Sequence, residues 1–438
     1  MERFRVLVLG PDCNPEEVSI PYVTYSHAAA LAELHDVTLV ARSRVEQPLQ
    51  KAGAPFRAIE VIPTPFLDKI FDWGFRKIFK GSYDGQALTA FRYPFSLAFE
   101  WYAWRALRHR IFSGEFDVVL RLIPMSPVLP SPFAYFLRNG PIPFVVGPLN
   151  GGLPWPAGFT QLQDQREWIS ILRNVYRYFP FARSTYRNAA AIIAASSQTY
   201  SEFEAYGHKL FFVPEPGISR ALCCSEPRRS EPNATLELLF VGGLVPRKAC
   251  DLALRAAAPL LLAERARFSV VGDGPERSRL EELVKSLGIA ERVTFYGWLS
   301  HSEVLSRFRT SDVFVFPTLR DNGAGVVFES LASGTVPVVV DFGGPGDIVN
   351  AKVGYKVPLT NEEDMVSQMT KALKELASDS DLLNRLRRNG IFYAQECLTW
   401  SEKAKRTSSV LAWAVGRGPK PDLRSPKALS AEQSSRDW

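Results

Sequence analysis

Short apolar runs rich in β-branched residues alternate along the chain with segments whose apolar positions recur every three to four residues. The first pattern is typical of strands buried on both faces, and the second of helices that cover them. This alternation predicts parallel sheets joined by crossover helices. The clearest predicted strands are residues 5–9, 36–41, 117–122, 143–147 and 190–196, followed by "LELLFVG", "RFSVVG", "RVTFYG", "DVFVFP" and "TVPVVV".

A polar, proline-bearing stretch separates two such series. After "FFVPEPGI" comes "LCCSEPRRSEPNAT", and the strand–helix alternation then restarts. We therefore expect an N-terminal domain over residues 1–217 and a C-terminal domain over residues 218–395. A helix over residues 396–415 follows, and residues 416–438 lack hydrophobic periodicity, which predicts a disordered tail.

Composition and charge narrow the class of protein. With 438 residues, 46% hydrophobic and 22% charged, the chain has the composition of a folded protein. A net charge of +6 favours anionic partners such as nucleotide diphosphates or phospholipid headgroups, and nothing beyond this charge indicates nucleic-acid binding. The five cysteines show no metal-ligand spacing, and no apolar run is long enough for a signal peptide or a membrane span. We expect a cytoplasmic protein without a metal site.

Four glycine-rich turns follow predicted strands, where ligands bind in open parallel sheets. They are "LFVGGLVPRKACDLAL", "VVGDGPERSRLEEL", "TLRDNGAGVVFESLASG" and "VVVDFGGPGDIV". In the first, Arg247 and Lys248 place cations near a helix N-terminus, which itself favours anions. Each turn can also be a plain strand–helix junction. No GxGxxG follows a strand and no GxxxxGK[ST] is present, which argues against NAD binding and ATP hydrolysis.

The third of these turns carries two acids. Asp321 lies in the loop, and Glu329 lies about one turn into the following helix. Backbone N–H groups at Asn322, Gly323 and Gly325 can face a phosphate, whereas carboxylates suit the hydroxyls of a sugar. The turn therefore predicts a sugar or ribose joined to a diphosphate. The alternative is that Asp321 caps the helix and Glu329 lies on a solvated face.

The combination of turns resembles a known family. "VGGLVPRKACDLALRA", "VVGDGP", "ERVTFYGWLSHSEV" and "DNGAGVVFESLASGTVPVV" occur in the order and spacing of the second domain of retaining glycosyltransferases of family four. The resemblance extends more weakly over residues 1–415. It implies the GT-B fold, in which two Rossmann-like domains with doubly wound parallel sheets face a deep cleft, and a helix over residues 396–415 that crosses back to the first domain. It also implies transfer from a nucleotide-diphosphate sugar with retention of configuration, without a metal or other cofactor.

The resemblance assigns roles to particular residues. Lys248 would bind the diphosphate, Asp321 would meet the donor sugar and Glu329 would hold the ribose hydroxyls, which makes these three the catalytic candidates. Two positions depart from the family, because Asp321 stands where a glutamate is usual and Gly243 where an arginine is usual. The other implied donor-binding residues are Gly242, Gly243, Arg247, Gly272, Asp273, Gly274, Trp298, Asn322, Gly323, Ala324, Gly325 and Val326.

The first domain departs further from the family. Many relatives carry a histidine where this chain has Ile123 or a neighbour, and none of the five histidines is an obvious substitute. "GPLNGGLPWPAGF" resembles a glycine-rich loop that faces the cleft in a subgroup of relatives. The candidates for the acceptor or cleft loop are Gly10, Asn14, Asn150, Gly151 and Gly152, with a merely structural turn as the alternative.

An aromatic and basic insertion occupies residues 66–112. Its segments "FLDKIFDWGFRKIFK" and "FEWYAWRALRHRIF" combine aromatic side chains with lysine and arginine. The pattern suits an interfacial helix on an anionic membrane or a pocket for a lipid-linked acceptor. The alternative is a helical hairpin that packs into the core.

The leading hypothesis is therefore a glycosyltransferase that acts on a glycan or lipid-linked acceptor in polysaccharide or glycolipid biosynthesis, at the inner face of a membrane. Two alternatives stay open. A nucleotide-sugar 2-epimerase on the same fold would need further acid–base residues in the first domain, where no clear set is seen. A catalytically weak nucleotide-sugar-binding protein is favoured by the missing histidine and by Gly243.

Overall fold

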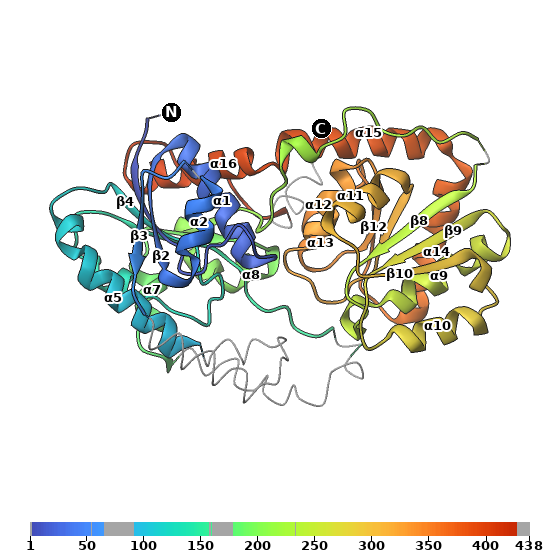
Figure 1. The fold of residues 1–438 in the computed structure, drawn as a ribbon, viewed down its shortest axis with the longest axis horizontal. Helices are drawn as coiled ribbons and strands as arrows, with labels where there is room; N and C mark the ends of the chain where they lie inside the picture. Colours follow the sequence, from blue (N-terminus) through green and yellow to red (C-terminus); the bar gives the residue numbers. More distant parts are fainter. Residues whose placement is uncertain are drawn as a thin grey trace. The chain divides into compact units, whose positions relative to one another are not determined.

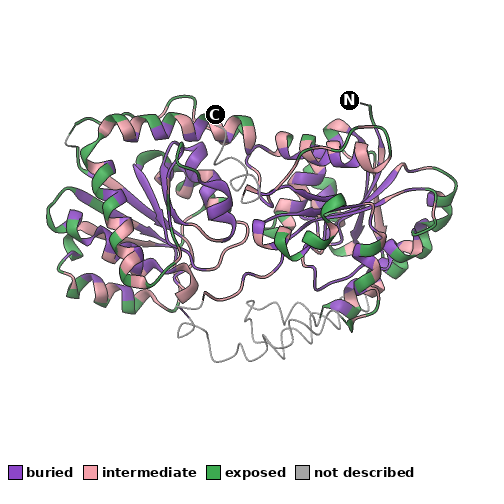
Figure 2. Cartoon of the chain, turned by 180° about the vertical axis from the view of Figure 1, so that it is seen from behind, coloured by how far each residue is buried: buried purple, intermediate pink, exposed green. Residues whose placement is uncertain are grey.

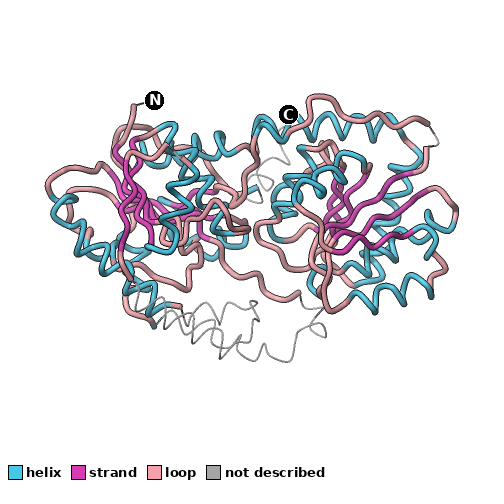
Figure 3. The backbone as a smooth tube through the Cα atoms, in the orientation of Figure 1, coloured by secondary structure: helices cyan, strands magenta, loops and turns pink. Residues whose placement is uncertain are grey.

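The computed structural model describes residues 2–53, 55–64, 92–156, 159, 178–232 and 234–426. The chain forms two compact units, shown as a ribbon in Figure 1. The first unit comprises Met1–Gly152, Gln165–Glu215 and Trp400–Trp438, and the second comprises Leu153–Asp164 and Pro216–Thr399. In both units helices flank a central sheet (Figure 3).

The first unit contains a seven-stranded parallel sheet in the order β3-β2-β1-β4-β5-β6-β7. Its strands are β1 (Arg5–Leu9), β2 (Asp36–Arg42), β3 (Ala58–Ile62), β4 (Val118–Arg121), β5 (Phe144–Leu149), β6 (Ala191–Ala194) and β7 (Leu210–Phe212). Its helices are α1 (Ile20–Leu34), α2 (Glu46–Ala52), α5 (Tyr93–Phe112), α6 (Phe133–Phe136), α7 (Ala182–Asn188), α8 (Ser197–Glu202) and α16 (Trp400–Ala414), with 3-10 turns η1 (Ser43–Val45) and η4 (Glu204–Lys209).

The second unit contains a six-stranded parallel sheet in the order β10-β9-β8-β11-β12-β13. Its strands are β8 (Leu236–Val241), β9 (Ala266–Val271), β10 (Val293–Gly297), β11 (Val313–Phe316), β12 (Val336–Val340) and β13 (Tyr355–Val357). Its helices are α9 (Cys250–Leu262), α10 (Arg277–Ser286), α11 (His301–Thr310), α12 (Gly325–Ala332), α13 (Gly343–Ile348), α14 (Glu362–Ser378) and α15 (Ser380–Cys397), with 3-10 turns η5 (Arg220–Leu222), η6 (Pro246–Lys248) and η7 (Ala290–Arg292).

Both sheets reverse their winding at one point, between β1 and β4 in the first unit and between β8 and β11 in the second. In doubly wound sheets ligands bind beyond the carboxyl ends of the strands at this topological switch point. The prediction of two Rossmann-like domains with doubly wound parallel sheets is confirmed. The switch point of the second sheet lies between the strands that precede the first and third glycine-rich turns.

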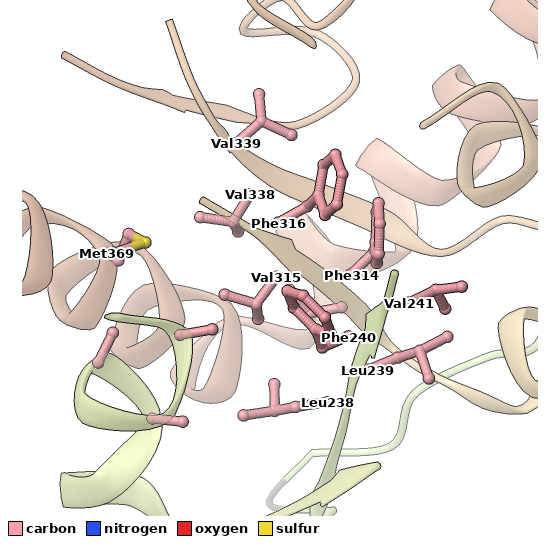
Figure 4. Close-up of a cluster of buried hydrophobic side chains, with 14 of the residues drawn as sticks. Leu238, Leu239, Phe240, Val241, Phe314, Val315, Phe316, Val338, Val339 and Met369 are labelled. Atoms are coloured by element: carbon pink, nitrogen blue, oxygen red, sulfur yellow. The ribbon is translucent and has the colours of Figure 1, made fainter. Parts of the chain in front are cut away.

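The central strands of the second sheet are apolar on both faces. Every residue of β11 and β12 is buried, and strands are the most uniformly buried elements in Figure 2. Figure 4 shows the side chains of β8, β11 and β12 gathered in one cluster with Met369 of α14. Continuous apolar runs therefore form the interior of a sheet covered by helices on both sides.

The largest difference between the unit boundaries and the predicted ones lies after Gly152. Leu153 and Phe159, which follow the glycine loop of the first half, are buried in the second unit, and Phe159 belongs to its core. Farther along, α16 packs on α1 of the first unit. There His27 Nε2 lies 2.9 Å from Thr407 Oγ1, in a buried contact between the two helices.

The prediction of a disordered tail from residue 416 is wrong for the described residues 416–426. The Arg417 guanidinium lies 2.9 Å from the Glu2 carboxylate, and the Phe212 N–H donates to the Leu423 carbonyl at 2.7 Å. Ser425 is buried. Hydrophobic periodicity is absent here because the segment packs as an extended chain, held by backbone hydrogen bonds and single side chains.

The predicted insertion is described from residue 92 onwards, and its segment 66–80 lies outside the described residues. Residues 93–112 form α5, whose buried face includes Phe99, Ala103, Leu107 and Ile111. This face packs into the core of the first unit, as the helical-hairpin alternative expected for it. Among the described residues, no helix has the length and apolar character needed to cross a membrane.

Candidate functional site

A half-buried charge pair lies at the switch point of the second sheet. Lys248 ends the turn η6 after β8, and Asp321 follows β11, the neighbouring strand. The Lys248 ammonium donates a hydrogen bond to Asp321 Oδ2, and the two side chains are 16% and 18% exposed. The same ammonium lies 4.8 Å from the centre of the Phe316 ring. The first and third predicted turns therefore meet, and the contact joins their candidate residues Lys248 and Asp321.

The turn between Asp321 and α12 contacts the same carboxylate. Asp321 Oδ1 accepts a hydrogen bond from the Ala324 N–H at 3.3 Å. Ala324 has a φ of 48°, a left-handed conformation that reverses the chain directly before the helix begins at Gly325. A Cβ on Gly325 would meet no atom within 4 Å. The N-terminus of α12 therefore opens beside the Asp321 carboxylate, and Asp321 serves the turn as well as Lys248.

A second cation lies close to this pair. Burial lowers the pKa of Arg247, while the charge of Asp321 raises it. The backbone carbonyl of Arg247 accepts a hydrogen bond from the Leu319 N–H at 2.8 Å, which ties η6 to the chain that leaves β11. Gly243, where the family usually has an arginine, leaves room for a side chain, because an added Cβ would lie 3.9 Å from the nearest atom, the Asp273 carbonyl oxygen.

The second predicted turn is explained mainly by packing. A Cβ on Gly272, whose φ is 126°, would overlap the Gly242 carbonyl, and one on Gly274 would overlap the Leu244 carbonyl. Asp273 accepts from the Gly274 N–H at 2.7 Å and lies 3.2 Å from Arg277. These glycines allow the turn after β9 to pack against the turn after β8. This agrees with the alternative that the second turn is a plain strand–helix junction.

Glu329 has a partner that the sequence did not reveal. Its Oε1 lies 2.9 Å from Nε2 of His301, the first residue of α11. The hydrogen bond to Glu329 raises the pKa of His301, against the effect of burial. Trp298, the first residue of the connection from β10 to α11, is 74% exposed. The sequence did contain a signal for the position of His301. In "SHSE", Ser300 and Glu303 form a capping box that fixes the start of α11 at His301.

The fourth predicted turn packs against the backbone of the third. The Gly344 N–H donates to the Asp321 carbonyl at 2.9 Å. A Cβ on Gly344 would overlap the Asn322 carbonyl, and one on Gly343 would lie 2.6 Å from Leu153 Cδ1. The segment after Gly152 therefore contributes to the second unit beside the candidate site, which sequence reasoning missed.

The remaining candidates lie in the first unit. Gly10 and Asn14 follow β1, where the Gly10 N–H donates to the Val40 carbonyl at 3.0 Å and the Asn14 amide donates to Glu17 at 2.9 Å. Asn150 and Gly151 follow β5. The Asn150 amide donates to Glu215, and the Gly151 N–H donates to Thr199 Oγ1 at 2.8 Å. Gly152 ends the same segment. These residues meet partners within the first unit, and a role toward donor or acceptor stays a prediction.

Comparisons with known proteins agree with this geometry. Residues 226–391 match the family model described as glycosyl transferases group 1. A D-inositol 3-phosphate glycosyltransferase of Streptomyces bingchenggensis is 30% identical over 226 residues, which cover 47% of this chain and 48% of the relative. The chain spans about half the length of the curated relatives it matches, 45% and 48% for two of them.

Solved structures share the fold over nearly the whole chain. Sucrose-phosphate synthase from Thermosynechococcus elongatus has a TM-score of 0.61 at 17% identity, covering 94% of this chain and 100% of its own. HepE from Anabaena, solved in complex with UDP, has a TM-score of 0.59 at 14% identity, covering 93% and 100%. These likenesses confirm the GT-B fold. The family match is a similarity in sequence, and it lies within the second unit. The chain thus has the fold of these glycosyltransferases, and residues 226–391 of its second unit are similar in sequence to glycosyl transferases group 1.

Proposed function

We propose that this protein transfers a sugar from a nucleotide-diphosphate sugar to a glycan or lipid-linked acceptor. The observation that carries the proposal is the Lys248–Asp321 pair at the switch point of the second sheet, beside the N-terminus of α12. A cation, a carboxylate and a helix N-terminus in one place suit a ligand that combines phosphates with hydroxyls.

The chemistry follows from where charge develops. Breaking the bond between sugar and phosphate leaves a nucleotide diphosphate, whose added negative charge must be stabilised as the bond lengthens. Lys248 and Arg247 supply positive charge there, and the amides before α12 supply hydrogen-bond donors. Because these groups can take the part of a divalent cation, we propose a reaction without a catalytic metal or other cofactor. The Asp321 carboxylate would stabilise the positive charge on the sugar, with retention of configuration.

The relatives favour particular donors. HepE binds UDP in its solved complex, and another HepE structure contains UDP-glucose. The curated relatives are named as glycosyltransferases. We therefore propose a uridine diphosphate sugar as the first donor to examine, with Glu329 accepting the ribose hydroxyls.

A thermal-shift screen examines the donor site directly. UDP-, GDP-, ADP- and dTDP-glucose are each added at millimolar concentration, and the donor is expected to raise the melting temperature, since a ligand at about 100 times its Kd stabilises the folded state by about 2.7 kcal/mol. Glu329→Ala should reduce this shift, whereas Lys285→Ala, which removes an exposed lysine of α10, should keep it. Failure of all four nucleotide sugars to shift the wild-type protein would contradict the assignment.

The alternatives differ in the products they form. A transferase releases the nucleoside diphosphate in proportion to the glycosylated acceptor. A 2-epimerase converts one nucleotide sugar into another, and a binding protein gives a thermal shift without turnover. Anion-exchange separation of the nucleotides after incubation with donor distinguishes the three outcomes.

We further propose that the first unit contacts an anionic membrane through an aromatic and basic face. This face is formed by exposed side chains of α5 and of the segment around α6, namely Trp101, Tyr102, Arg105, Arg108, Phe112, Tyr135 and Arg138. Its rings are continuous, since Trp101 and Tyr135 both contact Phe136, at 5.8 and 6.1 Å between ring centres. Within Tyr93–Phe112 the acidic residue is Glu100, which is buried. Exposed tryptophan and tyrosine beside arginine favour the interface of an anionic bilayer.

Cosedimentation with vesicles tests this face. The wild-type protein is expected to sediment with phosphatidylglycerol vesicles at low salt and to be released as salt screens the arginines. A variant with Trp101→Ser and Arg105→Ser should lose about tenfold in vesicle affinity, since each basic residue contributes about 1 kcal/mol and the aromatic ring adds further. Phe392→Ser removes an exposed ring of α15 and serves as the control. Equal sedimentation of both variants would contradict the proposal.

A further inference from the structure

The pair of His301 and Glu329 joins two helices of the second unit. Glu329 lies in α12, one turn beyond the candidate phosphate site, and His301 begins α11. Nε2 of His301 contacts Oε1 of Glu329 at 2.9 Å. The Glu329 side chain is 21% exposed and that of His301 is 63% exposed. One carboxylate oxygen is therefore engaged by the histidine on the open side of the helix pair.

Two other charged groups of α11 have different partners. Glu303, on the same helix as His301, accepts from the Ser300 N–H at 2.8 Å and from the Ser300 hydroxyl at 2.6 Å. Arg307, farther along the helix, lies over the Tyr296 ring at 3.9 Å. From α12, the group that faces His301 is Glu329. A change in the charge of His301 is thus felt first at the Glu329 carboxylate.

We propose that His301 is a positioning residue of the donor site, which holds one oxygen of Glu329, leaves the other for ribose hydroxyls and makes nucleotide affinity depend on pH. This inference rests on the proposed function, because it takes Glu329 as the ribose ligand. A carboxylate has two oxygens and about four acceptor positions, so a hydrogen bond from His301 fixes its orientation and leaves capacity for a diol. Fixing the rotamer before binding lowers the entropic cost of binding.

The sign of the pH effect follows from charge. An unneutralised Glu329 adds a negative charge next to an anionic nucleotide, and a protonated His301 cancels it. The hydrogen bond with Glu329 raises the pKa of His301 above its ordinary value of 6.5. Affinity is therefore greatest below that ordinary pKa and falls as pH rises through the raised pKa. By linkage, nucleotide binding should raise the pKa of His301 further.

The experiment measures nucleotide-sugar affinity by calorimetry from pH 5.5 to 9.0. The probe is the member of the UDP-, GDP-, ADP- and dTDP-glucose panel that binds best, because the phosphates of a nucleotide sugar are diesters that do not titrate in this range. His301→Gln keeps a hydrogen-bond donor but cannot become charged. The wild-type affinity should fall by about threefold to tenfold across the range, a typical effect of one partly screened charge, and that of His301→Gln should stay nearly level.

Two further variants test whether the pH dependence arises from His301 and acts through Glu329. His208→Gln replaces an exposed histidine of the first unit and should retain the wild-type pH profile. In a Glu329→Gln background, His301→Gln should have no further effect, because the histidine acts through the carboxylate. A flat wild-type profile, or a slope that survives in His301→Gln, would overturn the inference while leaving the donor site in place. If the wild-type protein binds no nucleotide sugar of the panel, the proposed function fails and the inference with it.

Discussion

Lys248→Ala is expected to lower turnover with a nucleotide sugar by about 10²- to 10³-fold, the usual cost of removing one preorganised group that stabilises developing negative charge. Lys248 is held in place by Asp321 and by the Phe316 ring, so little reorganisation is needed when charge appears on the phosphate. The measurement is the initial rate of nucleoside diphosphate release with donor and acceptor saturating. The loss should appear in kcat more than in KM, because the charge grows in the transition state.

Two comparison variants separate charge from structure. Lys248→Arg keeps the positive charge and should recover part of the rate. Lys285→Ala removes an exposed lysine of α10 and should match the wild-type protein. If Lys248→Ala lost less than about threefold in kcat, the lysine would have no part in stabilising the leaving diphosphate.

Glu100→Ala is expected to destabilise the first unit by about 3–5 kcal/mol, because it leaves a buried charge without its counter-ion. Arg121 of β4 and Glu100 of α5 are both 1% exposed, and Arg121 Nε lies 2.7 Å from Glu100 Oε1. Ser131 donates a further hydrogen bond to Glu100, and Arg121 donates to the Leu129 carbonyl at 2.7 Å. Hydrogen exchange of peptides that cover β4, together with urea unfolding, measures the loss.

A partly exposed pair between the last turn of α5 and the loop that follows it provides the matched control. Glu115 lies 2.7 Å from Arg110 but is 31% exposed, and Arg110 keeps Glu60 as a partner. Glu115→Ala should cost less than about 1 kcal/mol. Glu100→Met combined with Arg121→Leu should recover much of the loss, since apolar pairs can replace buried ion pairs. Equal effects of Glu100→Ala and Glu115→Ala would show that burial adds nothing to the pair.

Most strands that could be predicted from the sequence are buried on both faces, although the half-buried edge strand β10 was predicted as well. The predicted strand at 117–122 corresponds to β4, and the one at 190–196 corresponds to β6. The strands that were not predicted, β3, β7 and β13, all lie at the edge of a sheet. β3 is mostly half-buried, and β7 and β13 have three residues each, so none produces a long apolar run.

The candidate site could be predicted where the functional residues are close together in the sequence. The turn that contains Asp321 and the basic turn with Lys248 carry their residues in sequence, and the parallel sheet brings the two together. The contact between His301 and Glu329 joins residues from different connections. Leu153 lies beside Gly343 of the second unit, although the sequence pattern places Leu153 in the N-terminal domain. Such contacts depend on how helices and loops pack, which no local pattern encodes.

The path of the chain also sets the order in which the units can be completed during synthesis. The second unit is made of residues that all precede residue 400, whereas the first unit needs α16 and the Arg417 and Leu423 contacts that come after it. Until the last segment leaves the ribosome, the surface of α1 that receives α16 stays uncovered, including His27. The unit begun first is therefore finished last, and a nascent chain stalled near residue 400 would expose an apolar face suited to chaperones.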